Sequence, residues 1–169
     1  MLGGFAGTVA DIEQISVRGP WDTKSGAELS VLQAFTYDQV QQFFTYNPEM
    51  LARHREDIRG LRTYTVRGIP EGKMGGGEFH KIRQEILIGL EGLVDLRCED
   101  IYGGFRNFVL DSRSGVMIPP YMLHTYRSRE HSGLLVIANT LYDPDNPETH
   151  DTYSREEFET LQQEIRQTL

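Results

Sequence analysis

The sequence predicts an all-β domain. Short segments rich in β-branched and aromatic residues follow one another from about residue 62, and glycine or proline turns separate them. Residues 134–139 form an apolar run, which predicts a strand buried on both faces and central in a sheet. Strands at such short intervals are typical of an antiparallel barrel or sandwich.

The elements are expected in a simple order along the chain. The first segment ends at a glycine–proline turn, the second has its isoleucines on one face, and a glycine turns the chain into the third. A hairpin signal with two glycines follows, and two further strands lead to the central one. The segments are residues 62–66, 85–90, 93–99, 106–110, 116–119 and 134–139.

An amphipathic helix is predicted over residues 152–168. Ser154 and Glu157 have the spacing of a capping box, in which each side chain bonds the backbone N–H of the other residue. Apolar residues then recur on one helical face, and we expect this face to pack on the outside of the barrel. They are Phe158, Leu161 and Ile165.

A second helical region is predicted within residues 35–60. Thr36 and Gln39 form another capping box, and Asn47 with Pro48 ends the first helix. Aromatic residues are frequent here; they could cover a barrel mouth, pack in a dimer interface or form local core, of which local core is the commonest fate. They are Phe35, Tyr37, Phe43, Phe44 and Tyr46.

Size and composition limit the function. The 169 residues fit one domain, and the net charge of −8 argues against nucleic acid or an anionic membrane as a partner. No apolar run could span a membrane and no signal peptide is recognisable, so we expect a cytoplasmic protein. Cys98 is the only cysteine and fits a small buried strand residue. One small anionic ligand remains compatible, given local charges at Arg62, Arg67, Lys73, Lys81, Arg83 and Arg127.

The chemically richest stretch reads Gly72-(x)5-Glu78-x-His80-(x)4-Glu85-(x)6-Gly92. Glu78 and His80 lie two apart in a strand and project to the same face, and a short turn brings Glu85 beside them. These side chains can carry protons or bind a metal ion. The sequence therefore predicts a small-molecule site.

His124, which follows Pro119-Pro120, is a fourth candidate for this site. Two imidazoles and two carboxylates suit a divalent cation such as Mn²⁺, Fe²⁺, Ni²⁺ or Zn²⁺. The predicted metal ligands are Glu78, His80, Glu85 and His124. Such an ion would act as a Lewis acid on a carbonyl group.

The spacing resembles that of the cupin superfamily, whose first motif is G(X)5HXH(X)3–4E(X)6G and whose second ends in P-x-G-x-x-H. Glu78 stands where the first motif has its first histidine, and Tyr121 replaces the glycine of the second. The resemblance implies one cupin jelly-roll barrel over residues 1–169. Its core would be residues 61–150, with a first strand region at 18–32, a helical insertion at 35–60 and a C-terminal helix at 152–168.

Neighbouring segments look like the sugar-nucleotide 3,4-ketoisomerase branch of cupins, over about residues 61–160. Residues 76–81 match that branch's G-F-H-A-H-K, and Tyr142-Asp143 and Glu157-Phe158 fit its closing segments. The resemblance implies a homodimer that isomerises or epimerises a nucleotide-linked keto-sugar. Proton transfer would pass through an enediol-type intermediate.

The resemblance also implies residue roles. Glu78 takes the place of the proton-shuttling base and His80 supports it. A carboxylate can serve if burial raises its pKa toward neutrality. Tyrosines near the motifs could donate a proton or stack on a sugar ring, and Tyr126 is the expected catalytic one. The expected substrate-binding residues are Tyr64, Lys73, Lys81, Tyr121 and Arg127.

Two features separate this chain from that branch. Glu85 is present, although those isomerases generally lack this motif acid. Met74 and Gly75 stand where they place an arginine suited to a diphosphate. Two further hypotheses therefore remain: a metal-dependent cupin oxygenase or lyase acting on a small organic substrate, and a non-catalytic sugar-binding cupin.

Overall fold

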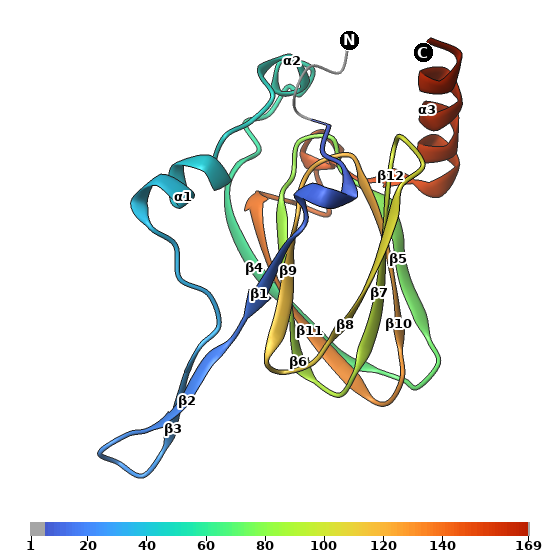
Figure 1. Cartoon of the computed structure of the whole chain (residues 1–169). Helices are drawn as coiled ribbons and strands as arrows, with labels where there is room; N and C mark the ends of the chain where they lie inside the picture. The colour runs from blue at the N-terminus through green and yellow to red at the C-terminus, as the bar shows by residue number, and fades with distance from the viewer. Residues whose placement is uncertain (1–5, 169) are drawn as a thin grey trace.

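The strands form two antiparallel five-stranded sheets in the computed structural model, which describes residues 6–168 (Figure 1). The first sheet has the order β1 (Glu13–Ser16), β9 (Ser114–Ile118), β6 (Glu85–Glu91), β11 (Ser132–Thr140) and β4 (Arg59–Ile69). The second has the order β12 (Tyr153–Ser154), β5 (Met74–Phe79), β10 (Met122–Ser128), β7 (Val94–Asp100) and β8 (Phe105–Leu110). The predicted all-β jelly roll is confirmed, as two packed sheets.

The apolar run at residues 134–139 is a central strand, as predicted. It lies in β11, which pairs with β4 on one side and β6 on the other. The hairpin predicted after residue 99 joins β7 to β8, and the Asp100 N–H donates to the Gly104 carbonyl at 2.9 Å. A separate hairpin of β2 (Arg18–Asp22) and β3 (Glu28–Val31) projects away from the two sheets (Figure 1).

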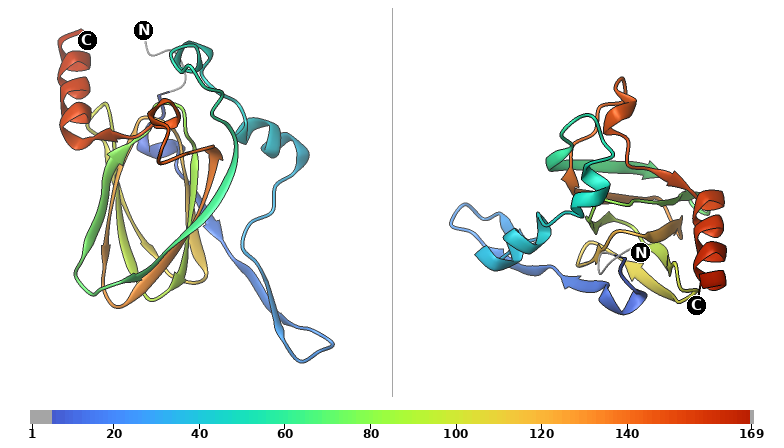
Figure 2. Two further views of the ribbon diagram at one scale, coloured as in Figure 1. Left: turned by 180° about the vertical axis from the view of Figure 1, so that it is seen from behind. Right: turned by 90° about the horizontal axis from the view of Figure 1, so that it is seen from above.

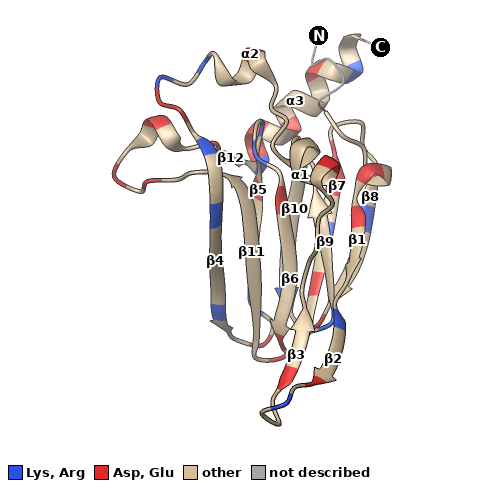
Figure 3. Cartoon of the chain, turned by 90° about the vertical axis from the view of Figure 1, so that its left-hand side faces the viewer, with Lys and Arg blue, Asp and Glu red and all other residues tan. Residues whose placement is uncertain are grey.

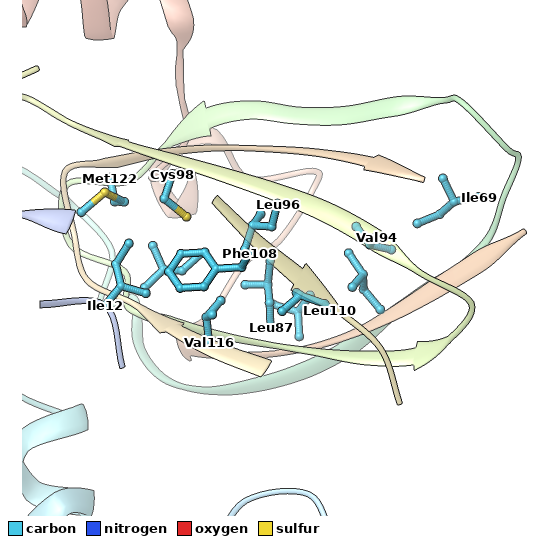
Figure 4. Packing of buried hydrophobic residues seen from close by; sticks show 13 residues of the cluster. Ile12, Ile69, Leu87, Val94, Leu96, Cys98, Phe108, Leu110, Val116 and Met122 are labelled. Atoms are coloured by element: carbon cyan, nitrogen blue, oxygen red, sulfur yellow. The ribbon is translucent and has the colours of Figure 1, made fainter. Parts of the chain in front are cut away.

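The main hydrophobic core lies between the sheets (Figure 4). Leu87 of β6 and Leu96 of β7 pack there, and Cys98 is buried beside them as expected. Because side chains alternate along a strand, Ile86 and Ile88 face the opposite way, where they form a second cluster outside the first sheet. Glu85 shares the inward direction of Leu87, and this alternation turns its carboxylate toward the interior.

The predicted helical region contains α1 (Tyr37–Phe43) and α2 (Pro48–Leu51). Thr36 and Gln39 form the expected capping box, and Asn47 caps α2. Several of the aromatic residues cover the outer face of the first sheet: Phe35, Phe43 and Phe44 pack with Ile86 and Ile88. Tyr37 instead is 75% exposed.

The C-terminal helix α3 (Arg155–Thr168) stands at one end of the body (Figure 2). Glu157 accepts hydrogen bonds from the backbone and hydroxyl of Ser154, which is the predicted capping box. Phe158 is buried against Phe79 of β5, with 5.2 Å between ring centroids. Two short 3-10 helices, Val9–Asp11 and Pro147–Thr149, complete the described elements. Within residues 6–168, no helix is long and apolar enough to cross a membrane.

Candidate functional site

Glu85 is the centre of a buried polar cluster between the sheets. Its Oε1 accepts a hydrogen bond from Nη1 of Arg83 at 2.9 Å and a longer one from the Tyr64 hydroxyl at 3.4 Å. Its Oε2 lies 3.6 Å from Nε2 of His80 and 3.4 Å from Nε2 of His124. The structure thus brings together the two histidines and one of the acids predicted from the sequence.

The charges around Glu85 set its ionisation. Burial opposes the charged form, but the neighbouring His80, His124 and Arg83 hold its pKa well below the usual range. For His124, burial lowers the pKa while the Glu85 carboxylate opposes that shift. The cluster therefore holds an ionised carboxylate in a water-poor interior.

Backbone carbonyls orient both imidazoles. Nδ1 of His80 lies 2.6 Å from the Asp151 carbonyl, and Nδ1 of His124 lies 3.1 Å from the Met122 carbonyl. A carbonyl can only accept, so each Nδ1 carries a hydrogen and each Nε2 points toward Glu85. This arrangement presents both Nε2 atoms to one point, where a shared proton or a metal ion would satisfy them.

Asp151, in the segment after β11, forms hydrogen bonds with the backbone beside this cluster. Its buried carboxylate accepts hydrogen bonds from three consecutive backbone N–H groups, those of Lys81, Ile82 and Arg83, at 3.0, 2.9 and 2.8 Å. The sequence analysis did not single out Asp151. Its carboxylate serves backbone groups 68–70 positions away in the chain, and no local pattern reports such a contact.

Arg83 is a second residue whose role the sequence did not reveal. Its buried guanidinium bonds Glu85, and it also donates to the hydroxyls of Thr140 at 3.2 Å and Thr152 at 3.4 Å. The spacing of Arg83 and Glu85, two apart at the start of a strand, was a usable signal because such residues share a face.

Glu78 joins the cluster to an open cavity of about 590 Å³. It is half-buried in β5 beside His124 of β10. Gly76 permits this close strand packing: its φ is +69°, and a Cβ there would lie 2.7 Å from the His124 carbonyl oxygen. The cavity is lined by Arg62, Tyr64, Glu78, Arg83, Tyr142, His150 and Thr152.

Three of the four predicted metal ligands fit a metal ion. Glu78, His80 and His124 offer donor atoms that lie within 4.8 Å of one another. Two imidazoles with a carboxylate suit a borderline divalent cation, which would polarise a substrate oxygen. Glu85 touches both imidazoles, but Arg83 already neutralises its charge.

Tyr64 is the expected substrate-binding residue that reaches the cavity. Burial, reinforced by the charge of Glu85, raises the pKa of its hydroxyl to about 12. The hydroxyl therefore stays protonated near neutral pH and is available as a donor. Tyr126, the expected catalytic tyrosine, does not line this cavity; it packs against the main core, and burial raises its pKa.

The other expected substrate-binding residues lie elsewhere. Lys81 and Tyr121 line a separate cavity of about 620 Å³ with residues of α2 and α3. Arg127 lines a third hollow together with Tyr126, and Lys73 is exposed in the turn before β5. The structure does not bring these four side chains to the Glu78 cavity.

Known structures share this arrangement of strands. WlaRA, a TDP-fucose-3,4-ketoisomerase from Campylobacter jejuni, matches with a TM-score of 0.62 and 16% identity over 92% of this chain and 98% of that one. QdtA, a sugar 3,4-ketoisomerase from Thermoanaerobacterium thermosaccharolyticum in complex with TDP, matches with 0.61 and 17% over 96% and 99%. A dTDP-4-dehydrorhamnose 3,5-epimerase from Bacillus anthracis, with TDP and PPi bound, matches with 0.58 and 9% over 85% and 78%. At these identities the likeness establishes the fold.

Sequence comparison identifies the family. No curated protein sequence matches the chain significantly. The family described as "WxcM-like, C-terminal" (FdtA) matches residues 54–159, which is more than half of the chain and contains every residue of the buried cluster. The chain therefore belongs to the WxcM-like C-terminal family.

Proposed function

We propose that the protein is an isomerase or epimerase of a nucleotide-linked keto-sugar and that Glu78 is its base. The observation that carries this proposal is the placement of Glu78. Its carboxylate lies on the cavity wall, within 4.8 Å of the donor atoms of His80 and His124. The structural neighbours include 3,4-ketoisomerases and a 3,5-epimerase, which supports the same class of reaction.

The reaction needs two proton movements, and the cavity offers groups for both. Glu78 removes the proton from the carbon next to the ketone, and the carbonyl oxygen takes up a proton to give an enediol. Tyr64 is the proposed donor to that oxygen, because it lines the cavity and its hydroxyl, which makes only a long 3.4 Å hydrogen bond to Glu85, stays protonated. Returning the carbon proton to the former carbonyl carbon, with loss of the neighbouring hydroxyl proton, moves the ketone by one position.

The buried cluster stabilises the developing negative charge. Arg83 lines the same cavity as Glu78, and its bonds to Glu85 and to the Thr140 and Thr152 hydroxyls fix its guanidinium donors in a region poor in water. Donors fixed before the reaction stabilise an oxyanion more strongly than mobile water does.

Turnover of Glu78→Gln tests this function. With a TDP-4-keto-6-deoxy sugar followed by NMR, we expect the variant to lose about 10²–10⁴-fold in kcat, the usual contribution of a general base. Glu71→Gln, an exposed acid in the turn before β5, is the matched control and should keep wild-type activity. Glu78→Gln activity within a fewfold of wild type would exclude Glu78 as the base.

A metal-dependent reaction is the second candidate, because Glu78, His80 and His124 can surround a cation. Elemental analysis of the purified protein distinguishes the two functions. Stoichiometric iron or nickel that is lost in His80→Ala and His124→Ala would favour an oxygenase or lyase. A protein that isomerises the keto-sugar at an unchanged rate after chelation would exclude a metal requirement.

We also propose a homodimer. The projecting β2–β3 hairpin exposes Trp21 at 49% and Leu29 at 48%, and β4 is an edge strand that pairs on one side only within residues 6–168. Exposed apolar side chains and open strand edges favour pairing between chains. Sizing at micromolar concentration should give twice the chain mass, and a monomer would contradict the proposal.

A further inference from the structure

Arg62 is an inward-facing arginine on the edge strand β4. Arginines recur along this strand at positions 59, 62 and 67 (Figure 3). Arg62 shares the inner face with Tyr64 and Val66, whereas Arg59 and Arg67 are exposed. Of these three arginines, only Arg62 lines the cavity that contains Glu78.

The Arg62 guanidinium has no acid in ion-pair contact among residues 6–168, and the more distant charge of Glu85 compensates it only in part. Its Nε is buried and has no hydrogen-bond partner among residues 6–168, and no acid in this part of the chain forms an ion pair with it. Arg83, the other arginine of the cavity, is neutralised by Glu85 at 2.9 Å. Charges withdrawn from water are normally paired, so a half-buried guanidinium with no ion-pair partner at a cavity wall is suited to an anionic ligand.

The ionisation of Arg62 agrees with this interpretation. Burial lowers its pKa, and the nearby positive charge of Arg83 lowers it further. Both effects disfavour the charged form, and the charge of Glu85 opposes them only in part. An anion bound beside Arg62 would offset both effects, because a further opposite charge favours the ionised guanidinium.

Two aromatic rings lie against the Arg62 guanidinium. Its central carbon lies 5.0 Å from the ring centroid of Tyr64 and 5.0 Å from that of Tyr142. Tyr142 in turn stacks on His150, with centroids 4.7 Å apart and planes inclined by 19°. Contacts of this kind with aromatic rings favour an arginine in a fixed orientation. Its N–H groups are then arranged to bind two oxygens of one anion.

We infer that Arg62 binds an oxyanion of the substrate and so determines which sugars this cavity accepts. The ligand class is a sugar that carries a phosphate, diphosphate or carboxylate group. This inference rests on the proposed function in one respect: the same cavity holds the reacting sugar near Glu78. The related isomerases have an arginine where this chain has Met74 and Gly75, which cannot bind an anion through a side-chain charge. Arg62 would bind the anion in its place.

Calorimetric titration with pyrophosphate, TDP, glucuronate and thymidine tests the inference. We expect the wild-type protein to bind pyrophosphate and TDP if the anion is a phosphate, or glucuronate if it is a carboxylate. Thymidine, which has no anionic group, should bind at least tenfold more weakly than TDP. Arg62→Gln should weaken the anionic probe at least tenfold, and Arg62→Lys, which keeps the charge but not the paired donors, at least threefold.

Arg67→Gln is the matched control, because it removes the same charge from the exposed face of the same strand. It should change the dissociation constant less than twofold. The inference is overturned if no anionic probe binds to the wild-type protein at millimolar concentration, if Arg62→Gln binds as well as wild type, or if Arg67→Gln loses as much. Circular dichroism verifies folding, and Arg62→Lys provides the test should Arg62→Gln unfold.

Failure of this inference is distinguishable from failure of the proposed function. Binding of the probes requires no turnover, so an inactive protein that binds TDP through Arg62 supports the inference alone. Conversely, a protein that isomerises keto-sugars equally well with and without Arg62 keeps its function and loses this specificity residue.

Discussion

Removal of the Glu85 charge should destabilise the protein strongly. Glu85 and Arg83 are each 3% exposed, and their ion pair is 2.9 Å long. Glu85→Gln leaves the buried guanidinium without its counter-charge, which typically costs about 3–5 kcal/mol when one partner of a buried pair is removed. In a domain of this size, 1 kcal/mol corresponds to roughly 2–4 °C, so we expect Tm to fall by roughly 6–20 °C.

Urea unfolding of three variants and the wild type measures this effect. Glu148→Gln is the matched control, because Glu148 forms a 3.2 Å pair with Arg55 whose side chains are 38% and 83% exposed. It should change the free energy of unfolding by less than about 1 kcal/mol. Arg83→Met combined with Glu85→Gln should recover part of the loss relative to Glu85→Gln, because the unpaired charge is gone. The reasoning is refuted if Glu85→Gln is as stable as Glu148→Gln.

Three further predictions follow from the same structure. The pKa of Glu85 is depressed in the folded state, so its ionisation stabilises the fold above the unfolded pKa of about 4.3, and this stability is lost as pH falls below that value. Between pH 7 and pH 3, the urea midpoint should therefore fall less in Glu85→Gln than in wild type. Equal slopes of the midpoint against pH would contradict this prediction. Burial raises the pKa of the Cys98 thiol to about 12, so Ellman's reagent at pH 8 should not label the native protein. In urea it should label one thiol per chain. Rapid labelling of the native protein would argue against the buried position. Gly76→Ala should lower the free energy of unfolding by about 1 kcal/mol or more beyond the loss in Gly26→Ala. Both glycines have a positive φ, but only at Gly76 would the added Cβ meet a backbone oxygen, at 2.7 Å. Equal losses of stability in thermal unfolding would refute this.

Local sequence patterns were sufficient to predict most elements of the fold. The capping boxes at Thr36 and Ser154, the central strand and the hairpin after β7 depend on neighbours a few residues apart, and they are present as expected. Alternation also grouped Ile86 with Ile88 correctly. It could not show that these residues face outward, because the helical region that covers them lies about 45 residues earlier in the chain.

In the candidate site too, local spacing predicted some residues, whereas the roles of others depend on contacts distant in the chain. Motif spacing found Glu78, His80, Glu85 and His124, which lie close together in space. It missed the roles of Arg83 and Asp151 because their contacts depend on tertiary packing. Lys81 follows His80 directly in the chain, yet Lys81 faces a different cavity, because Asp151 binds the backbone at this bend and the side chains diverge there.

The sequence also could not show which of six basic residues line the Glu78 cavity. Sequence placed Arg62, Arg67, Lys73, Lys81, Arg83 and Arg127 in the relevant region but could not show which ones converge. Strand direction separates Arg62 from Arg67, and only the packed structure reveals that Arg83 forms an ion pair with Glu85 whereas Arg62 forms none among residues 6–168.

Exchange of the substrate's carbon-bound hydrogen with solvent reports directly on the proton removal that is assigned to Glu78. A TDP-4-keto-6-deoxy sugar incubated with the protein in D₂O should gain deuterium at the carbon next to the ketone, as read by mass spectrometry and NMR. The account predicts that Glu71→Gln exchanges as wild type does and that Glu78→Gln exchanges at the rate of the uncatalysed control. Deuterium uptake at the wild-type rate in Glu78→Gln would contradict the assignment of Glu78 as the base.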